Sequence, residues 1–399
     1  MSLTLSRKAQ AVKPSSTLAI TAKAKELKEK GKDVVGFGAG EPDFNTPSNI
    51  NQAGIKAINE GFTKYTVDSG MPELKKAVCE KFARFNHLHY EANQIVISNG
   101  GKHSLTNIFE AILNPGDEVI IPAPYWLSYP EIVRLADGIP VYIRGGKEQN
   151  YKVTAQQIAD ACTLNTKALI LNTPNNPTGM LYSREELEEI AKVIIEKDIY
   201  VIADEMYENL VYGEEEFVSI ASLNDEIYAR CITCSGLAKS YAMTGWRIGY
   251  TGSSVEIAKL MGSIQSHQTS NPNSIAQKAA IEALTGPQDA VEAMLVEFDR
   301  RRKFMYAKVV TFPHVSAIEP KGAFYQFLDV SELLNLSYQG EQVKTVKRLA
   351  QILLEDYLVA VIPCEDFGFD DHIRLSYAIS IEAIGKGLDR IEKFIQALV

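Results

Sequence analysis

Residues 168–204 read ALILNTPNNPTGMLYSREELEEIAKVIIEKDIYVIAD, and this stretch decides the fold class. The apolar runs at 168–171 and 200–203 are continuous, as in strands that are buried on both faces of a parallel sheet. Between them, Ser183 and Glu186 can form a capping box, and apolar residues then recur at helical spacing: Leu187, Ile190, Ala191 and Ile194. The order of strand, helix and strand predicts an α/β fold with a mainly parallel sheet that helices cover on both faces.

The same alternation continues on both sides of this unit. We predict strands at residues 95–98 and 118–121, with a helix at 102–113 between them. A further buried strand is predicted at 228–234. Together these elements predict one large domain that spans residues 46–286.

Residues 287–399 have a different pattern, which favours a smaller α+β domain. A long helical stretch is predicted at 287–310. Short strands and helical patterns follow it, with strands near 316–318, 324–328, 359–362 and 373–377 and helices near 341–356 and 381–398. The N-terminal segment, residues 1–45, is expected to pack with this smaller domain.

The composition limits the class of protein. Of the 399 residues, 46% are hydrophobic and 23% are charged, as in ordinary globular proteins. The net charge of -9 argues against nucleic acid or an anionic membrane as the main partner. No apolar run reaches the roughly 18 residues that a membrane span needs, and the N-terminus lacks the apolar core of a signal peptide. The expected location is the cytoplasm.

Five cysteines at low density fit reduced thiols in a cytosolic protein. Cys231 and Cys234 form a C-x-x-C pair, but residues three apart on a strand point to opposite faces. We therefore expect two buried apolar side chains there, and not a metal or redox site.

Two other motif classes are rejected. Gly36, Gly38 and Gly40 suggest a dinucleotide-binding loop, but Glu41 stands where that loop needs its third glycine. No histidine pair has the spacing of a zinc protease, and no G-x-S-x-G nucleophile elbow occurs. No metal site is predicted.

The stretch SGLAKSYAMTGWRIG at residues 235–249 carries the candidate chemistry. Lys239 follows a predicted buried strand, stands among small and apolar residues, and has Arg247 eight positions later. A lysine that is desolvated near a fixed cation can have a lowered pKa and act as an amine nucleophile. On spacing alone, a solvated surface lysine is the simpler interpretation.

These residues resemble the cofactor-lysine segment of the class I/II aminotransferases, the aspartate aminotransferase type of pyridoxal phosphate enzyme. The nearest resemblance is to a bacterial subgroup whose lysine segment reads A-K-x-x-A-M-T-G-W-R. Further motifs match in the family's order and cover nearly the whole chain: GEPDF at 40–44, KY at 64–65, PYW at 124–126, NNPTG at 175–179, DEMY at 204–207 and RLSY at 374–377. Each motif alone is weak, whereas together at these intervals they are specific.

The resemblance implies pyridoxal 5'-phosphate as the cofactor and assigns roles around its ring. Lys239 would bind it covalently and later move a proton between the substrate Cα and the cofactor. Asp204 would pair with the pyridine nitrogen, and Tyr207 and Asn176 would hydrogen-bond the phenolic oxygen. Trp126 would stack on the ring. A plain turn explains the composition around Asn176 equally well.

The phosphate would lie at the start of the predicted helix at 102–113. Backbone N–H groups of Gly101 and Lys102 would bind it there, where the helix dipole favours an anion, and Arg247 would add a charge-assisted contact. Tyr65 would reach the phosphate of the other subunit, which implies a homodimer with shared active sites. Many relatives carry hydroxyls one and three residues before the lysine, where this chain has Ala238 and Gly236, so a part for Ser235 is left open.

The substrate contacts follow from the same resemblance. Arg374 would grip the α-carboxylate, with Gly40, Trp126 and Asn176 beside it; a structural ion pair is the alternative for this arginine. Lys102 would bind the distal carboxylate of an acidic substrate, helped by a hydroxyl from the segment Ser15-Ser16-Thr17. Alternatively, Lys102 only offsets the phosphate charge or points to solvent.

The expected function is transfer of an amino group between aspartate or glutamate and a 2-oxo acid such as 2-oxoglutarate. Aromatic, kynurenine or prephenate substrates are alternatives, and so is β-elimination from cysteine conjugates, because one fold serves both reactions. A non-enzymatic regulator would need a DNA-binding module, and no basic patch precedes the motifs.

Overall fold

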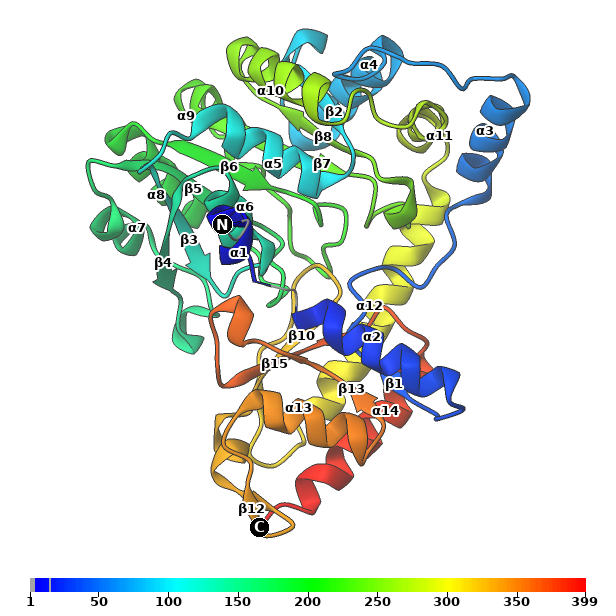
Figure 1. Ribbon diagram of the computed structural model, residues 1–399, viewed down its shortest axis with the longest axis vertical. Coiled ribbons are helices and arrows are strands. Elements are labelled where there is room, and N and C mark those ends of the chain that lie inside the picture. The colour runs from blue at the N-terminus through cyan, green and yellow to red at the C-terminus, as the bar shows by residue number, and fades with distance from the viewer. Residues whose placement is uncertain (1–3, 14–15) are drawn as a thin grey trace.

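The computed structural model describes residues 4–13 and 16–399. Its largest sheet has seven strands in the order β2-β8-β7-β6-β5-β3-β4 (Figure 1). Their bounds are β2 (Ile95–Ser98), β8 (Gly249–Gly252), β7 (Cys231–Gly236), β6 (Tyr200–Asp204), β5 (Thr166–Asn172), β3 (Glu118–Ala123) and β4 (Ile139–Arg144). Only β8 runs antiparallel to its neighbours, so the mainly parallel α/β sheet predicted from the sequence is confirmed.

Helices cover both faces of this sheet, because alternate residues of each strand point to opposite sides. On β5, Leu169 and Leu171 pack with one core cluster, whereas Ala168 and Ile170 pack with another. Six α-helices of the described residues contribute buried side chains to the first cluster: α3 (Ser48–Asn59), α4 (Pro72–Lys81), α7 (Ala155–Ala161), α8 (Arg184–Lys197), α9 (Asp225–Arg230) and α11 (Ser274–Thr285). Three cover the other face: α5 (Gly101–Ile112), α6 (Ser128–Leu135) and α10 (Val255–Gln268).

The capping box predicted for α8 is present. The Ser183 hydroxyl accepts from the Glu186 N–H, and the Glu186 side chain accepts from the Ser183 N–H. The four apolar residues expected on one face of this helix, Leu187, Ile190, Ala191 and Ile194, are all buried. The local pattern therefore reports both where the helix begins and which face it buries.

A second, antiparallel sheet has the order β14-β15-β10-β9. Its strands are β14 (Ile362–Pro363), β15 (His372–Ser376), β10 (Tyr325–Asp329) and β9 (Ser316–Ala317), and three helices lie beside it: α12 (Asp289–Val309), α13 (Val346–Glu355) and α14 (Ile381–Gln396). From the N-terminal part, β1 (Val35–Gly36) pairs in parallel with β13 (Val359–Ala360). Helix α2 (Ser16–Glu29) lies in the same lower part of the molecule (Figure 1). The domain boundaries at 45 and 286 stay a prediction.

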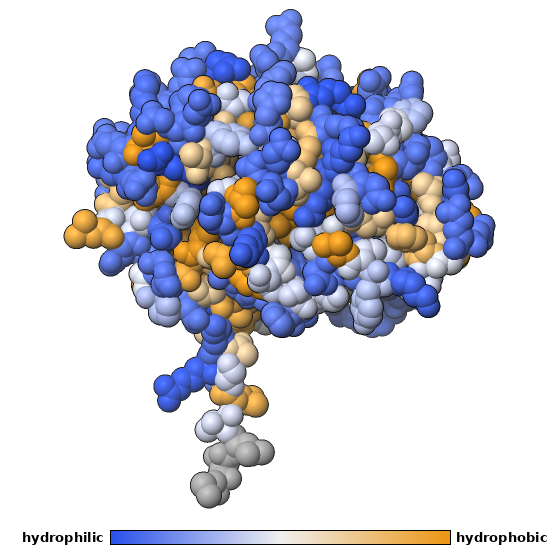
Figure 2. Space-filling model, turned by 90° about the horizontal axis from the view of Figure 1, so that it is seen from above, coloured by the Kyte–Doolittle hydropathy of each residue, from blue (hydrophilic) through white to orange (hydrophobic). Residues whose placement is uncertain are grey.

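The remaining elements are short or peripheral. Helix α1 (Arg7–Ala11) contacts α6, α3 (Ser48–Asn59) packs on α11, and β11 (Ser337–Tyr338) pairs with β12 (Glu341–Gln342). Seen from above, on the side of α3, α4, α10 and α11, the surface is mainly hydrophilic with separate apolar patches (Figure 2). Among the helices of residues 4–13 and 16–399, none is long and apolar enough to cross a membrane.

Three element boundaries differ from the prediction. Residues 228–230 end helix α9 instead of beginning a strand, because Asn224 caps that helix by accepting from two N–H groups. Residues 359–362 form two strands, β13 and β14, which pair in different sheets. Helix α13 begins only at Val346, after its cap Thr345, and residues 341–342 belong to β12.

Cys231 and Cys234 both lie on β7 and both are buried free thiols. Cys231 packs with the core cluster on one face of the sheet and Cys234 with the cluster on the other. The prediction that these two side chains point apart is confirmed.

Candidate active site

A cavity of about 770 Å³ is lined by residues from both sheets. Ten of the eleven site residues predicted from the sequence line it: Gly40, Gly101, Lys102, Trp126, Asn176, Asp204, Tyr207, Lys239, Arg247 and Arg374. The eleventh, Tyr65, lies outside this cavity and is 89% exposed.

Strand topology explains why residues far apart in the sequence meet here. Asp204 ends β6, Lys239 follows β7 by three residues, and Gly101 begins the helix after β2. These strands run in the same direction, so their carboxyl ends meet at one edge of the sheet, where ligands bind in open α/β sheets. Arg374 comes from β15 of the second sheet and closes the cavity from the other side.

The Asp204 carboxylate is buried without a cation. The Tyr129 hydroxyl donates to it at 2.6 Å and the Met206 N–H at 3.2 Å. Burial raises the pKa of Asp204 above its usual range, although both hydrogen bonds oppose this. Among the described residues, no Lys, Arg or His nitrogen lies within 4.0 Å of the carboxylate, so it can accept a charged N–H from a ligand.

Lys239 is the partly buried amine of the cavity. Its Nζ donates to the Gly40 carbonyl. Burial, helped by the charges of Arg374 and Arg247, lowers the pKa of Lys239 to about 8, although the charges of Glu41 and Asp204 oppose this shift. A substantial fraction of this amine is therefore neutral near pH 7–8 and able to act as a nucleophile.

Arg374 is held in place by polar contacts that leave its charge unmatched. It is 2% exposed, and its Nη1 and Nη2 donate to Asn176 Oδ1 at 2.9 Å and Gly38 O at 3.2 Å. Its guanidinium carbon lies 4.3 Å from the ring centroid of Tyr325, and its buried Nε has no partner. Within the described chain no carboxylate lies within 4.0 Å, so the structural ion pair left open by the sequence is not formed.

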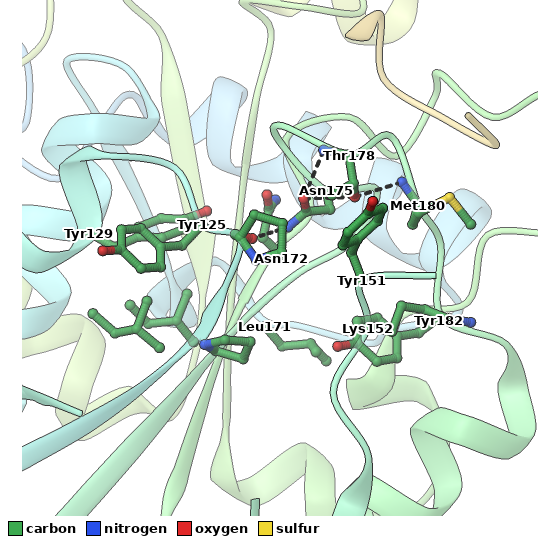
Figure 3. A pocket seen from close by; sticks show the side chains of 14 residues that line it. Tyr125, Tyr129, Tyr151, Lys152, Leu171, Asn172, Asn175, Thr178, Met180 and Tyr182 are labelled. Carbon is green, nitrogen blue, oxygen red and sulfur yellow. Dashed lines mark hydrogen bonds between the residues drawn. The ribbon is translucent and has the colours of Figure 1, made fainter. Parts of the chain in front are cut away.

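The turn that carries Asn176 is braced by its neighbours (Figure 3). Asn175 Oδ1 accepts from the Thr178 N–H at 3.1 Å and hydroxyl at 2.9 Å, and the Thr178 hydroxyl accepts from the Met180 N–H at 3.1 Å. The Asn176 N–H donates to Asn172 Oδ1 at 2.9 Å. The segment is therefore both a tight turn and a support for Arg374.

The start of α5 forms an anion cradle. Gly100, with φ +86°, caps the helix without any side-chain hydrogen bond, which leaves the first N–H groups available. A Cβ on Gly100 would come within 2.4 Å of Arg247 Nη2, and one on Gly101 would come within 2.4 Å of Met206 Cε. The close approach of an exposed guanidinium to this backbone therefore requires glycine at Gly100.

Lys102 and Trp126 lie together at the same cavity. Lys102 Nζ is 5.0 Å from the ring centroid of Trp126, and the Trp126 ring meets Tyr129 edge to face at 5.4 Å. Partial burial and then the charge of Arg247 lower the pKa of Lys102. Its ammonium forms no ion pair with any described carboxylate.

The structure adds residues that the sequence motifs did not indicate. Tyr325 shares a 2.9 Å hydrogen bond between its hydroxyl and that of Tyr207, and Tyr129 bonds Asp204. Tyr129 lies in an amphipathic helix and Tyr325 in a short strand, where a core tyrosine is the ordinary expectation. No local signal distinguishes them.

Of the hydroxyls expected to share the substrate contact, only one can be placed. Ser15 lies outside the described residues, and the Ser16 side chain is not described. Thr17 lines the cavity, and its buried hydroxyl has no hydrogen-bond partner in the described structure.

The donor set fits pyridoxal phosphate. An anion cradle at α5, a buried carboxylate without a cation at Asp204, and a partly buried amine with a lowered pKa at Lys239 match its phosphate, its pyridine nitrogen and its aldehyde. These groups come from three different chain segments and line one cavity.

Comparison with known proteins agrees with this geometry. Residues 32–391 match the family model for aminotransferase class I and II. An aspartate aminotransferase of Bacillus sp. (strain YM-2) is 50% identical over 98% of this chain and 99% of its own length. An aspartate/prephenate aminotransferase of Cereibacter sphaeroides is 46% identical over 97% of each chain. The crystal structure of the aspartate aminotransferase from Rhizobium meliloti superimposes with a TM-score of 0.96 at 40% identity and covers 100% of both chains.

The family match covers both sheets and every segment that lines the cavity beyond helix α2, and the full-length relatives extend over the rest. The resemblance inferred from the sequence motifs is thus confirmed, and the chain belongs to the class I and II aminotransferases.

Proposed function

We propose that this aminotransferase moves an amino group between an acidic amino acid, aspartate or glutamate, and a 2-oxo acid such as 2-oxoglutarate, with pyridoxal phosphate as cofactor. One observation carries the proposal: two cations without carboxylate partners in the described chain, Arg374 and Lys102, line the same cavity as the amine of Lys239. Two unmatched cations near one nucleophile suit a substrate with two carboxylates.

The residues that would hold the cofactor are those of the cradle and the buried carboxylate. Gly101 and Lys102 N–H groups and Arg247 would bind its phosphate, and Asp204 would accept from its pyridine nitrogen, with Trp126 against the ring. When bound, pyridoxal phosphate supplies an electron sink that stabilises negative charge on the substrate Cα.

The chain's own residues orient the substrate and move the proton. Arg374 would bind the α-carboxylate through two parallel N–H donors, because its contacts to Asn176 and Gly38 fix the guanidinium and leave three of its five N–H groups unused in the described structure. Lys239, whose lowered pKa leaves part of it neutral near pH 7–8, would move the proton between the substrate Cα and the cofactor. The hydrogen-bonded pair Tyr207 and Tyr325 would present a hydroxyl beside the cofactor ring.

Lys102 would select the distal carboxylate. A charge-assisted contact is worth roughly 1.5–3 kcal/mol, which corresponds to about a tenfold to hundredfold preference over a neutral side chain. The unpartnered Thr17 hydroxyl lines the same cavity and would share this contact. The printed names of the relatives, aspartate and aspartate/prephenate aminotransferases, support an acidic substrate.

A larger dicarboxylate is the second candidate. A cavity of about 770 Å³ exceeds what the cofactor and an aspartate need, and it extends along α2 as far as Lys28. The relative from Cereibacter sphaeroides is named for prephenate as well as aspartate. A similar solved structure is named an aromatic aminotransferase, so aromatic substrates stay an alternative. Kynurenine substrates and β-elimination have no observation of this kind in their favour.

We further propose a homodimer with shared active sites in the cytoplasm. Tyr65 is 89% exposed on the segment after α3, Val67 is exposed on the same segment, and Ile58 is exposed near the end of α3. Such apolar exposure suits a surface covered by a second copy. Tyr65 would then reach the phosphate bound by that copy.

The test is a set of half-reactions. We expect kcat/KM of the wild type to be highest for aspartate or glutamate, and Lys102→Ala to lose about tenfold to hundredfold for these two but little for phenylalanine or alanine. A matched control is Lys192→Ala, an exposed lysine on α8. An equal loss of kcat/KM on all four substrates would show that Lys102 does not contact the substrate side chain. Release of ammonia, without transfer of the amino group to a 2-oxo acid, would show elimination.

A further inference from the structure

A cluster of buried polar side chains lies directly behind the active site and takes no part in the mechanism above. Its members are Lys81, Asn86, Glu205, Glu208, Ser219 and Ser235, each at most 5% exposed. Lys81 ends α4, Asn86 follows in the next helical turn, and Ser235 lies on β7. Burying two carboxylates costs free energy unless they are paired and hydrogen-bonded. The burial of Glu205 and Glu208 therefore needs an explanation.

The hydrogen bonds join all members. Lys81 Nζ forms an ion pair with Glu208 and donates to Asn86 Oδ1 at 2.8 Å. Asn86 Nδ2 donates to Glu205 at 2.9 Å and to Glu208 at 2.7 Å. The Ser219 hydroxyl donates to Glu205 at 2.5 Å, and the Ser235 hydroxyl donates to Glu208 at 2.6 Å.

The cluster shares one chain turn with the active site. Asp204 and Tyr207 line the cavity, whereas Glu205 and Glu208 point into the cluster. Residues three apart on a helical turn lie on the same face, and the Glu208 N–H does donate to the Glu205 carbonyl at 3.0 Å. This turn therefore directs Asp204 and Tyr207 toward the cavity and Glu205 and Glu208 into the buried cluster.

The charges in the cluster are unequal. Other titratable groups face the two carboxylates, and burial raises the pKa of each, so they are neutral at pH 7: Tyr90, Cys231, Cys234, Tyr241 and Tyr250. Lys81 is then the only cation that faces the carboxylates in the described structure. One cation balances one carboxylate, and burial followed by the charge of Glu208 raises the pKa of Glu205 to about 8.

We propose that Lys81, Asn86, Glu205 and Glu208 form a buried clamp that positions Asp204 and Tyr207, with the Lys81–Glu208 ion pair at its centre. The clamp also reaches, through Ser235, the strand that leads to Lys239. These are positioning residues, since none of the four lines the cavity. The inference rests on the proposed function, because it assigns support to residues that would hold the cofactor.

The experiment compares variants by cofactor affinity and by the absorption spectrum of the bound cofactor. Glu205→Gln replaces a carboxyl that has no ion-pair partner in the described structure by a neutral group of the same shape, so we expect a pyridoxal phosphate Kd within about threefold of wild type. Lys81→Met with Glu208→Gln removes the ion pair without leaving a buried charge. For this double variant we expect a Kd raised roughly tenfold to hundredfold, the cost of removing supporting groups in metal sites, and a changed pH dependence of the absorption.

Ser235→Ala is a milder variant that tests the clamp if the double variant does not fold. It removes one hydrogen bond to Glu208 and leaves the Lys81–Glu208 ion pair in place, so we expect the pyridoxal phosphate Kd to rise about threefold to tenfold. Glu188→Gln, an exposed carboxylate on α8, is the matched control and should behave as wild type. Wild-type affinity and absorption in Ser235→Ala, or equal damage from Glu205→Gln and Glu208→Gln, would overturn the clamp. Cofactor titration needs no amino acid, so failure of the acidic-substrate proposal would be seen separately as weak wild-type turnover of aspartate.

Discussion

Replacing Arg374 removes the group that we expect to bind the substrate α-carboxylate. The guanidinium has five N–H donors, and its contacts to Asn176 and Gly38 occupy two of them. Three N–H donors therefore remain in the described structure, and a two-pronged contact needs two of them. Two charge-assisted hydrogen bonds at roughly 1.5–3 kcal/mol each give about 3–6 kcal/mol, which is on the order of 10²- to 10⁴-fold in kcat/KM.

The assay is the single half-reaction with aspartate, followed by the absorption of the bound cofactor. Arg374→Ala should lose the full amount, about 10²- to 10⁴-fold in kcat/KM. Arg374→Lys should lose an intermediate amount of kcat/KM, because an ammonium keeps the charge but lacks the planar, two-pronged donor geometry. Arg300→Ala removes an exposed arginine of α12 and serves as the control. The cofactor Kd of Arg374→Ala should change little, since the phosphate cradle is untouched.

A substrate analogue without the α-carboxylate separates binding from collapse of the site. A primary amine of similar size should react equally slowly with wild type and Arg374→Ala, because neither protein can use the missing contact. The reasoning is refuted if Arg374→Ala loses less than about tenfold with aspartate, or if the amine loses as much as aspartate does.

Two further predictions concern the cofactor. Burial lowers the pKa of Lys239 to about 8, and only the neutral amine attacks an aldehyde. The rate of covalent cofactor binding by the apoprotein should therefore rise with pH up to about 8 and level off above it. Borohydride reduction and peptide mass spectrometry should place the cofactor on Lys239, and an adduct on another lysine would contradict the assignment. Tyr65→Phe should raise the cofactor Kd about tenfold to hundredfold through loss of one charge-assisted bond, and mixing it with Lys239→Ala subunits should restore one site of wild-type affinity per mixed dimer, whereas full activity of a dilute monomer would rule out shared sites.

Local sequence was sufficient for many elements of the fold. Continuous apolar runs located β5 and β6, and the capping box located the start of α8, because these features depend on neighbouring residues only. The predicted boundaries were wrong where a competing local signal or a distant partner determined the structure. Asn224 caps the start of α9, so residues 228–230 are helical and not part of the predicted strand. Residues 359–362 are divided because they pair with two different sheets.

The candidate site divides in the same way. Its motif residues were named from the sequence through their resemblance to a family, and ten of them line one cavity. The partners Tyr325 and Tyr129 were missed, because a tyrosine in an apolar strand or helix has the same local pattern whether it packs in a core or supports a catalytic carboxylate.

The sequence by itself determined an α/β chain with a nucleophilic lysine candidate, since periodicity, capping and motif order are local properties that survive without tertiary contacts. Only the tertiary structure decided that Arg374 has no ion partner among residues 4–13 and 16–399, that Lys239 is desolvated, and that Glu205 and Glu208 lie beside the buried Lys81. The physical reason is that burial and charge balance depend on which distant segments pack together. Strand order sets that packing, and no short stretch of sequence encodes it.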